Sequence, residues 1–206
     1  FKDLLSEAKK RAPSARIIGC SCAGVIGTEG ASESMKALGI MAVRGPKEQF
    51  ALAWVDDIKG ANSFDAAALL AKDLQRQNSR ISMIHLLAPG IDISADRVIN
   101  GIESIFGKEM PIFGATSSDN MKAVSSFQFA DDRVFERGAV AVGFADSTLD
   151  VITGATHGFE VIGLPFTVTK ADANRVYELD GKPAWDCYTQ SLGLLSQASL
   201  KETIPV

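Results

Sequence analysis

Apolar residues recur along the chain at two spacings that predict alternating helices and strands. Apolar side chains three and four positions apart, with a capping or breaking residue at one end, predict helices over 2–11, 62–74 and 94–107. Short runs rich in β-branched or apolar residues and bounded by Pro or Gly predict strands over 15–20, 81–88 and 111–114. The order strand, helix, strand over 81–114 predicts one parallel pair, because the helix carries the chain back across the sheet.

Antiparallel pairing is predicted on both sides of this unit. The apolar runs 37–43 and 50–55 flank a connector of turn composition and are typical of a hairpin. From about residue 122 the chain changes to strand-like runs over 124–129, 133–144, 149–155 and 166–177, and Pro183 marks the start of a short helix. The predicted fold class is α/β in the broad, α+β sense: a mixed parallel and antiparallel sheet packed with helices, with a β-rich second half.

The composition is that of an ordinary globular protein with a small acidic excess. The 206 residues are 46% hydrophobic and 22% charged, and 21 Lys and Arg against 25 Asp and Glu give a formal net charge of −4. This balance argues against a nucleic-acid partner. No apolar run approaches the roughly 20 residues of a membrane helix, so we expect no membrane partner. The odd number of cysteines, three, is typical of a reducing compartment, and we expect a cytoplasmic location.

The first candidate site is the glycine-rich segment 19–27, which follows a predicted strand. A helix beginning at Ala23 would point free backbone N–H groups at an anionic ligand such as a carboxylate. The alternative is that the glycines only permit a tight turn, which a serine caps. The candidate ligand-binding residues of this segment are Gly19, Ser21, Cys22 and Gly24.

The second candidate site is the segment 114–120, which also follows a predicted strand. Its short hydroxyl, carboxylate and amide side chains suit a small polar ligand, although alone they are typical of a surface turn. Both segments leave core strands, where open α/β sheets hold ligands, so we predict that they lie side by side and form one site. The candidate ligand-binding residues of this segment are Thr116, Ser117, Asp119 and Asn120.

No complete catalytic or metal-binding motif is present, and we expect no catalytic residue set, no metal and no cofactor. We interpret His85 as a hydrogen-bonded core histidine and His157 as a solvated turn residue. Three cysteines and two distant histidines do not supply the four ligands of a structural zinc site. A hydrolase-like enzyme stays open as an alternative, with Ser21 or Cys22 as nucleophile and Asp119 and His157 as partners of the serine.

Several stretches together resemble the FIST domain family. They are 17–24 (IIGCSCAG), 113–120 (FGATSSDN), 163–171 (GLPFTVTKA) and 177–184 (YELDGKPA). The resemblance covers nearly the whole chain and implies an intracellular sensory domain of signal-transduction proteins that binds small ligands such as amino acids. The chain departs from the family pattern at Cys22 and Val25, where Thr and an acidic residue are usual, and at Thr116 and Ser118, where Gly and Asp are usual.

The resemblance also divides the chain into an N-terminal FIST-like sensing domain over 1–180 and the start of a C-terminal FIST-like domain over 181–206. Because the chain begins at Phe1 without an initiator Met, we expect a fragment or a processed piece. The resemblance implies that the first strand of the family is missing, and we expect the surface left uncovered to cause self-association. The expected function is non-enzymatic: a small-ligand sensor that passes its occupancy to an output domain or partner protein. A non-catalytic adaptor for protein partners is the third alternative.

Overall fold

The computed structural model describes residues 1–34, 36–120, 122, 124–152, 154, 156–161 and 163–203. The chain forms two compact units, Phe1–Thr153 and Gly154–Val206. The family-based boundary after residue 180 stays a prediction.

A four-stranded mixed sheet is the centre of the first unit. Its strands are β4 (Phe50–Val55), β9 (Ala139–Phe144), β5 (Met83–Ala88) and β6 (Ile112–Thr116), in the spatial order β4-β9-β5-β6. β9 is antiparallel to both of its neighbours, and β5 and β6 are parallel, which confirms the predicted mixed sheet. The parallel pair needs Gly114, because a Cβ there would lie 1.8 Å from Leu86 O.

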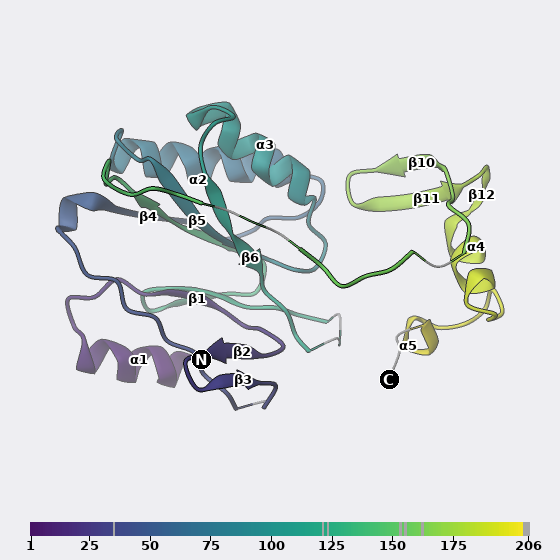
Figure 1. The fold of residues 1–206 in the computed structure, drawn as a ribbon, viewed down its shortest axis with the longest axis horizontal. Helices are drawn as coiled ribbons and strands as arrows, with labels where there is room; N and C mark the ends of the chain where they lie inside the picture. Colours follow the sequence, from purple (N-terminus) through teal and green to yellow (C-terminus); the bar gives the residue numbers. More distant parts are fainter. Residues whose placement is uncertain are drawn as a thin grey trace. The chain divides into compact units, whose positions relative to one another are not determined.

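Two helices cover one face of this sheet (Figure 1). They are α2 (Ser63–Gln77) and α3 (Ala95–Phe106), and both were predicted from their apolar spacing. Alternate strand residues, among them Ala53, Ile84 and Ala141, point toward the helices and are fully buried with them. The helices approach closely at Gly101, where a Cβ would lie 2.4 Å from Phe64 O.

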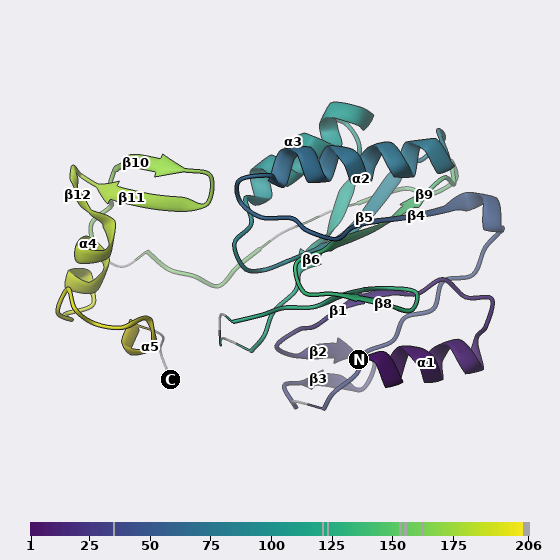
Figure 2. The ribbon, with the colours of Figure 1, turned by 180° about the vertical axis from the view of Figure 1, so that it is seen from behind.

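A small antiparallel sheet packs on the opposite face (Figures 1 and 2). Its strands are β1 (Ile18–Cys20), β7 (Gln128–Ala130) and β8 (Arg133–Phe135), in the order β1-β7-β8. A second core of Leu52, Leu87, Ala130, Phe135 and Val140 lies between the two sheets. Beneath the small sheet lie the helix α1 (Lys2–Arg11) and the hairpin of β2 (Val25–Gly27) and β3 (Gly30–Ser32).

The second unit holds an antiparallel hairpin followed by helices. Its elements are β10 (Val168–Asp172), β11 (Arg175–Leu179), β12 (Lys182–Pro183), α4 (Ala184–Ser191) and α5 (Leu200–Thr203). β11 pairs with β10 on one side and β12 on the other. The predicted helix after Pro183 is confirmed as α4.

Some local predictions are wrong because distant partners override the local pattern. The predicted hairpin of 37–43 with 50–55 does not form: 37–46 has no regular element, a short 3-10 helix, η1 (Lys47–Gln49), follows, and β4 pairs along its whole length with β9. No helix begins at Ala23, since the chain enters β2 two residues later. Residues 149–152 form no strand, and the remainder of that predicted run includes Thr153 and Ala155, which lie outside the described residues.

Candidate functional site

The two predicted loops lie side by side where β1 and β6 end. The Ser118 backbone N–H donates to Ser21 O at 3.0 Å, and Ser21 Oγ donates to Ser118 O at 2.7 Å. The predicted neighbourhood of 19–24 and 114–120 is therefore confirmed. We call these two segments the loop junction, and ligand binding there stays a prediction.

Ser21 uses its polar groups inside the fold. Its N–H donates to Phe127 O at 2.8 Å, and its Oγ accepts the Phe127 N–H at 2.9 Å while donating to Ser118 O. The residue thus ties the end of β1 to the end of β6 and to the segment before β7. In this arrangement its N–H does not point at a ligand carboxylate, and its hydroxyl is held by two backbone groups rather than by a general base.

Ser117 belongs to a buried polar network that joins the two sheets. Its Oγ contacts Ser126 Oγ at 2.9 Å and accepts a hydrogen bond from Gln128 Nε2 at 2.5 Å. The Gln128 side-chain oxygen in turn accepts the Gly138 N–H at 2.9 Å. Sequence analysis singled out Ser117 but not its two buried polar partners, Ser126 just before β7 and Gln128 at the start of β7.

Asp119 organises the far side of the loop junction. Its Oδ2 accepts the backbone N–H groups of Val124 at 2.6 Å and Ser125 at 3.1 Å. Asn120 follows in the left-handed region, with φ of 59°, and its N–H contacts Ser118 Oγ at 3.4 Å. A ligand ammonium group would therefore share the Asp119 carboxylate with donors of its own loop.

The solvent-facing part of the loop junction is smaller than predicted. Gly19 is partly buried against the Phe129 ring, and of the eight predicted ligand-binding residues only Cys22, Gly24, Thr116 and Asn120 are exposed. We call these four residues the junction rim. Burial raises the pKa of the neighbouring Cys20 thiol, and Cys22 raises it further, so Cys20 is held as a thiol.

The loop junction lies at the carboxyl edge of the four-stranded sheet. β4, β5 and β6 run in one direction, because β9 is antiparallel to both β4 and β5 and β6 is parallel to β5. The loops after these strands therefore share an edge, and α2 and α3 begin there. Gly60 N–H donates to Asp92 O at 2.8 Å, and Ser94 N–H donates to Ser63 Oγ at 3.1 Å. These hydrogen bonds join the loop after β4 to the loop after β5.

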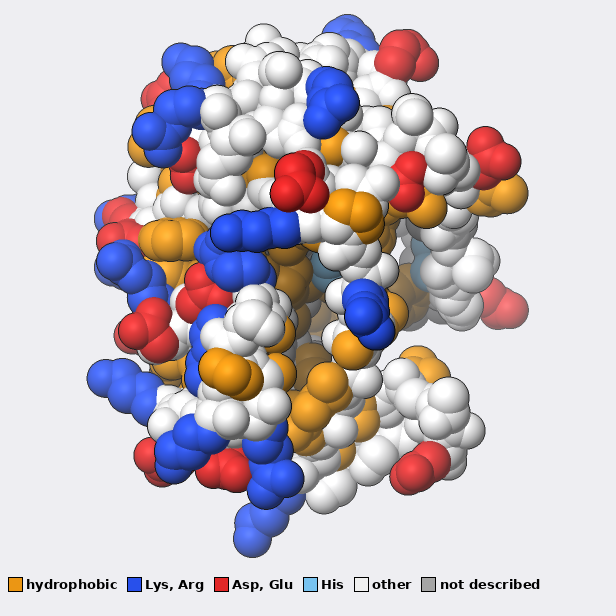
Figure 3. Space-filling view, turned by 90° about the vertical axis from the view of Figure 1, so that its left-hand side faces the viewer, with side chains coloured by type: hydrophobic (Ala, Val, Ile, Leu, Met, Phe, Trp, Pro, Cys, Tyr) orange, Lys and Arg blue, Asp and Glu red, His pale blue; other side chains and the backbone are white. Residues whose placement is uncertain are grey.

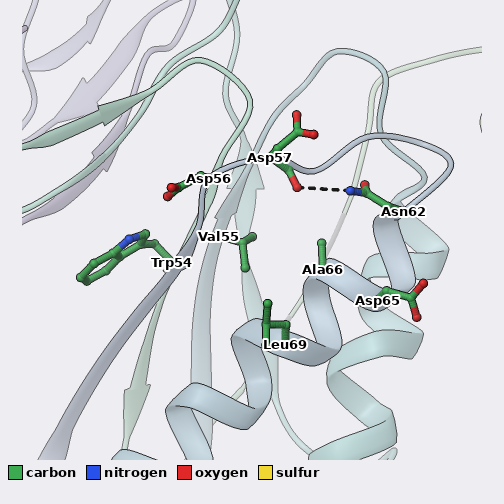
Figure 4. Close-up of a pocket in the computed structure, with 8 residues that line it drawn as sticks. All are labelled: Trp54, Val55, Asp56, Asp57, Asn62, Asp65, Ala66 and Leu69. Carbon is green, nitrogen blue, oxygen red and sulfur yellow. Dashed lines mark hydrogen bonds between the residues drawn. The ribbon is translucent and has the colours of Figure 1, made fainter.

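A cavity of about 550 Å³ lies between the end of β4 and the first turns of α2. Figure 4 shows Val55 and Ala66 facing each other across it, with the Trp54 ring pointing away from α2. The Asp57 carboxylate is paired with Lys59 at 3.1 Å and Arg137 at 3.3 Å. Sequence analysis missed this cavity, and its signal is the Asp56–Asp57 pair directly after a predicted strand.

The two histidines have different surroundings. His85 is partly buried and stacked on Phe113, with ring centroids 4.6 Å apart, and it makes no hydrogen bond with the described residues, so the predicted hydrogen-bonded core histidine is wrong. His157 is exposed in the second unit, as expected, and its Nδ1 accepts the Phe159 N–H at 3.2 Å.

The part of the chain that the structure describes shows neither a metal site nor a membrane-spanning helix. No group of three His, Cys, Asp or Glu side chains there is placed to hold a metal ion. None of its helices combines the length and apolar character needed to cross a membrane.

Comparison with known proteins shows which family the chain resembles. The model of the FIST N domain matches residues 1–182. An uncharacterized protein of Methanocaldococcus jannaschii is 36% identical over 94 residues, which are 44% of this chain and 18% of that protein. The aligned segment thus spans less than a fifth of the relative. No solved structure matches the chain.

The fold and the family match together define an α+β sensory-type domain. The chain belongs to the FIST N domain family, a family of sensory domains of signal-transduction proteins.

Proposed function

We propose that this chain is a cytoplasmic small-molecule sensor that binds a small polar metabolite at the loop junction, with amino acids as the first class to test. The observation that carries the proposal is the pair of hydrogen bonds between Ser21 and Ser118, because it joins two polar loops from different sheets at one carboxyl edge. The junction rim offers a hydroxyl, an amide, a thiol and loop backbone to such a ligand.

The same contacts supply a route from ligand to output. Ser21 connects the junction to the small sheet, and Ser117 connects it through Gln128 to the start of β9. A ligand that favours one arrangement of the two loops then shifts the equilibrium between arrangements of the two sheets by its differential affinity. An output domain or partner protein would respond to that shift.

A thermal-shift screen against amino acids and related metabolites tests the proposal. A ligand at about 100 times its dissociation constant stabilises the folded state by roughly 2.7 kcal/mol. Thr116→Val removes the rim hydroxyl at nearly constant volume and should weaken the ligand found. Thr28→Val, in the exposed turn of the β2–β3 hairpin, is the matched control and should bind as the wild type does. Equal binding by all three proteins would remove the loop junction from the site.

The hydrolase alternative now rests on Cys22 rather than Ser21. The Ser21 hydroxyl is hydrogen-bonded to two backbone groups, whereas the Cys22 side chain belongs to an exposed residue. A catalytic Cys22 should react with iodoacetamide much faster than a free thiol does at the same pH. An ordinary rate would favour the non-enzymatic sensor.

A further inference from the structure

One face of the four-stranded sheet is only half covered. Strand registers place Leu52, Val142, His85 and Phe113 in one row across the face that carries the small sheet, and Phe50, Phe144 and Met83 in the next. The small sheet packs on the β4–β9 side and on the carboxyl end of β5, where Leu87 is buried. Met83, His85, Phe113 and Phe144 stay partly exposed and belong to neither buried core.

These four residues form the floor of what we call the sheet hollow. Figure 3, which looks at the left-hand side of Figure 1, shows the surface deeply hollowed, with hydrophobic side chains in its depth and Lys, Arg, Asp and Glu on the surrounding surface. The floor itself carries no Lys, Arg, Asp or Glu side chain. It therefore suits an uncharged apolar ligand better than a polar metabolite.

His85 gives the floor its one hydrogen-bonding group. Neither ring nitrogen is bonded to a described residue, and the ring lies flat on Phe113 with an interplanar angle of 7°. Burial lowers the pKa of His85, so the ring is neutral at pH 7 and presents one donor and one acceptor nitrogen. A half-buried imidazole whose nitrogens have no hydrogen-bond partner among the described residues can form a hydrogen bond with a polar group of a ligand.

An apolar strap crosses from the lower layer of the unit to the start of β4. We define the strap as residues 38–46, in which Gly39 lies beside Val25 of β2 and Gly45 beside the Phe50 ring. Its large side chains have little cover: Ile40 is 79% exposed, Met41 81% and Val43 58%. Figure 1 shows this connector rising on the side from which Figure 3 is viewed.

We infer that the sheet hollow binds a flat, uncharged, largely aromatic small molecule that has one hydrogen-bonding group for His85. The ligand ring lies against the His85–Phe113 stack, and the apolar strap residues fold over it. This site shares no residue with the junction rim, so it does not depend on the function proposed above.

N-phenyl-1-naphthylamine is a suitable probe, because it is neutral, aromatic and carries a single N–H donor. We expect saturable fluorescence enhancement at one probe per chain. Because the chain has only two histidines, His85 and His157, ring NMR signals report the position directly. The probe should shift the His85 signals and leave those of His157 unchanged, with His85→Phe and His157→Gln serving to assign them.

Three variants and two controls separate binding in the sheet hollow from general hydrophobic binding. His85→Phe keeps the aromatic floor but removes the acceptor, and it should weaken the probe about fivefold, the effect of losing one hydrogen bond of roughly 1 kcal/mol. Met83→Glu places a charge on the floor and should abolish binding, whereas Leu69→Glu, at an exposed apolar position of α2, should not. Ile40→Ser combined with Met41→Ser should also weaken binding, and Ile26→Ser, equally exposed on β2, should not.

Four results would overturn the inference. The first is that the probe does not bind saturably, and the second is that it leaves the ring signals of His85 unchanged. The third is that His85→Phe and Met83→Glu bind the probe as tightly as the wild type does. The fourth is that sedimentation shows a concentration-dependent dimer that excludes the probe. The last result would assign the hollow to a second copy of the chain. Thr116→Val should not change the affinity of this probe, so failure of one site leaves the other unaffected.

Discussion

The two faces of the four-stranded sheet differ in how completely they are covered. On the helix face, alternate residues such as Ala53, Ile84 and Ala141 are fully buried, and small side chains let α2 and α3 approach closely. On the other face, burial is complete only beneath the small sheet, and the β5–β6 part carries partly exposed Met83, His85 and Phe113. Because stabilisation scales with the apolar area removed from water, we expect the helix face to supply more of the stability than the other face, whose β5–β6 part keeps apolar side chains in contact with water.

The largest test of this comparison uses two neighbours on β5 that point to opposite faces. Ile84→Ala, at a side chain with 0% exposure, should lower the free energy of unfolding by about 2–5 kcal/mol, since it removes buried methyl groups and leaves a cavity. Met83→Ala, on the partly exposed floor, should lower it by only about 1 kcal/mol. Urea unfolding followed by circular dichroism measures both. Equal losses would mean that the two faces are packed alike.

The second test compares adjacent residues of the loop junction. Ser21→Ala leaves the Phe127 N–H and the Ser118 carbonyl without their side-chain partner, and should lower the free energy of unfolding by about 1–3 kcal/mol. Cys22→Ala, at an exposed side chain, should stay within about 0.5 kcal/mol of the wild type. A Ser21→Ala protein as stable as Cys22→Ala would show that the tie between the loops contributes nothing.

Elements whose signal lies within one segment could be predicted from the sequence. The helices α2 and α3 follow from apolar spacing with polar caps, and β5 from a β-rich run that ends at Pro89. The segment 37–43 has strand composition too, but a strand needs a partner, and β9, some 90 residues further along, pairs with β4 instead. The local pattern therefore indicated that the segment 37–43 could form a strand, but it forms none because β4 pairs with β9 instead.

The sequence predicted that the two loops of the candidate site lie together, but it did not predict the structural role of their residues. Two loops leaving core strands were expected to meet, and hydrogen bonds join them. That Ser21 is a structural tie depends on Ser118 and Phe127, which are 97 and 106 residues away. The floor of the sheet hollow likewise emerges only from strand registers, because Met83, His85 and Phe113 are ordinary members of apolar runs in the sequence.

A third, smaller test concerns the attachment of the small sheet. Asp131 accepts the Ile17 N–H at 3.1 Å and pairs with Arg16 at 2.8 Å and Lys9 at 3.3 Å. Burial raises the pKa of Asp131, but these hydrogen bonds and positive charges outweigh it and lower the pKa below its usual value. The contribution of the carboxylate to stability is therefore present at neutral pH and lost as pH falls through the lowered pKa.

Asp131→Asn keeps a residue that tolerates the φ of 54° at this turn and removes only the charge. It should lower the free energy of unfolding by about 0.5–1 kcal/mol at pH 7, the range of partly exposed ion pairs. The difference from the wild type should shrink as pH falls below about 4, the usual range of an aspartate. Urea unfolding at several pH values measures it, and a difference that is constant with pH would assign the effect to shape rather than to charge.

The smallest expected effect is the pH dependence of stability that comes from His85, on the half-covered face of the sheet. Burial lowers the pKa of His85, so the unfolded chain takes up a proton at a higher pH than the folded one does. Wild-type stability should therefore begin to fall once pH drops below about 6.5, the unfolded value, and should stop falling on this account below the lowered folded pKa. His85→Gln should lack this component, whereas His157→Gln, at an exposed position, should keep it. NMR titration of the His85 ring gives the direct measurement: it should protonate below about pH 6.5, the pKa of an unperturbed histidine, and probe bound in the sheet hollow should lower the His85 pKa further, because an uncharged aromatic ligand excludes water from the imidazole. A His85 pKa at the value of an unperturbed histidine would mean that the sheet hollow is fully open to water.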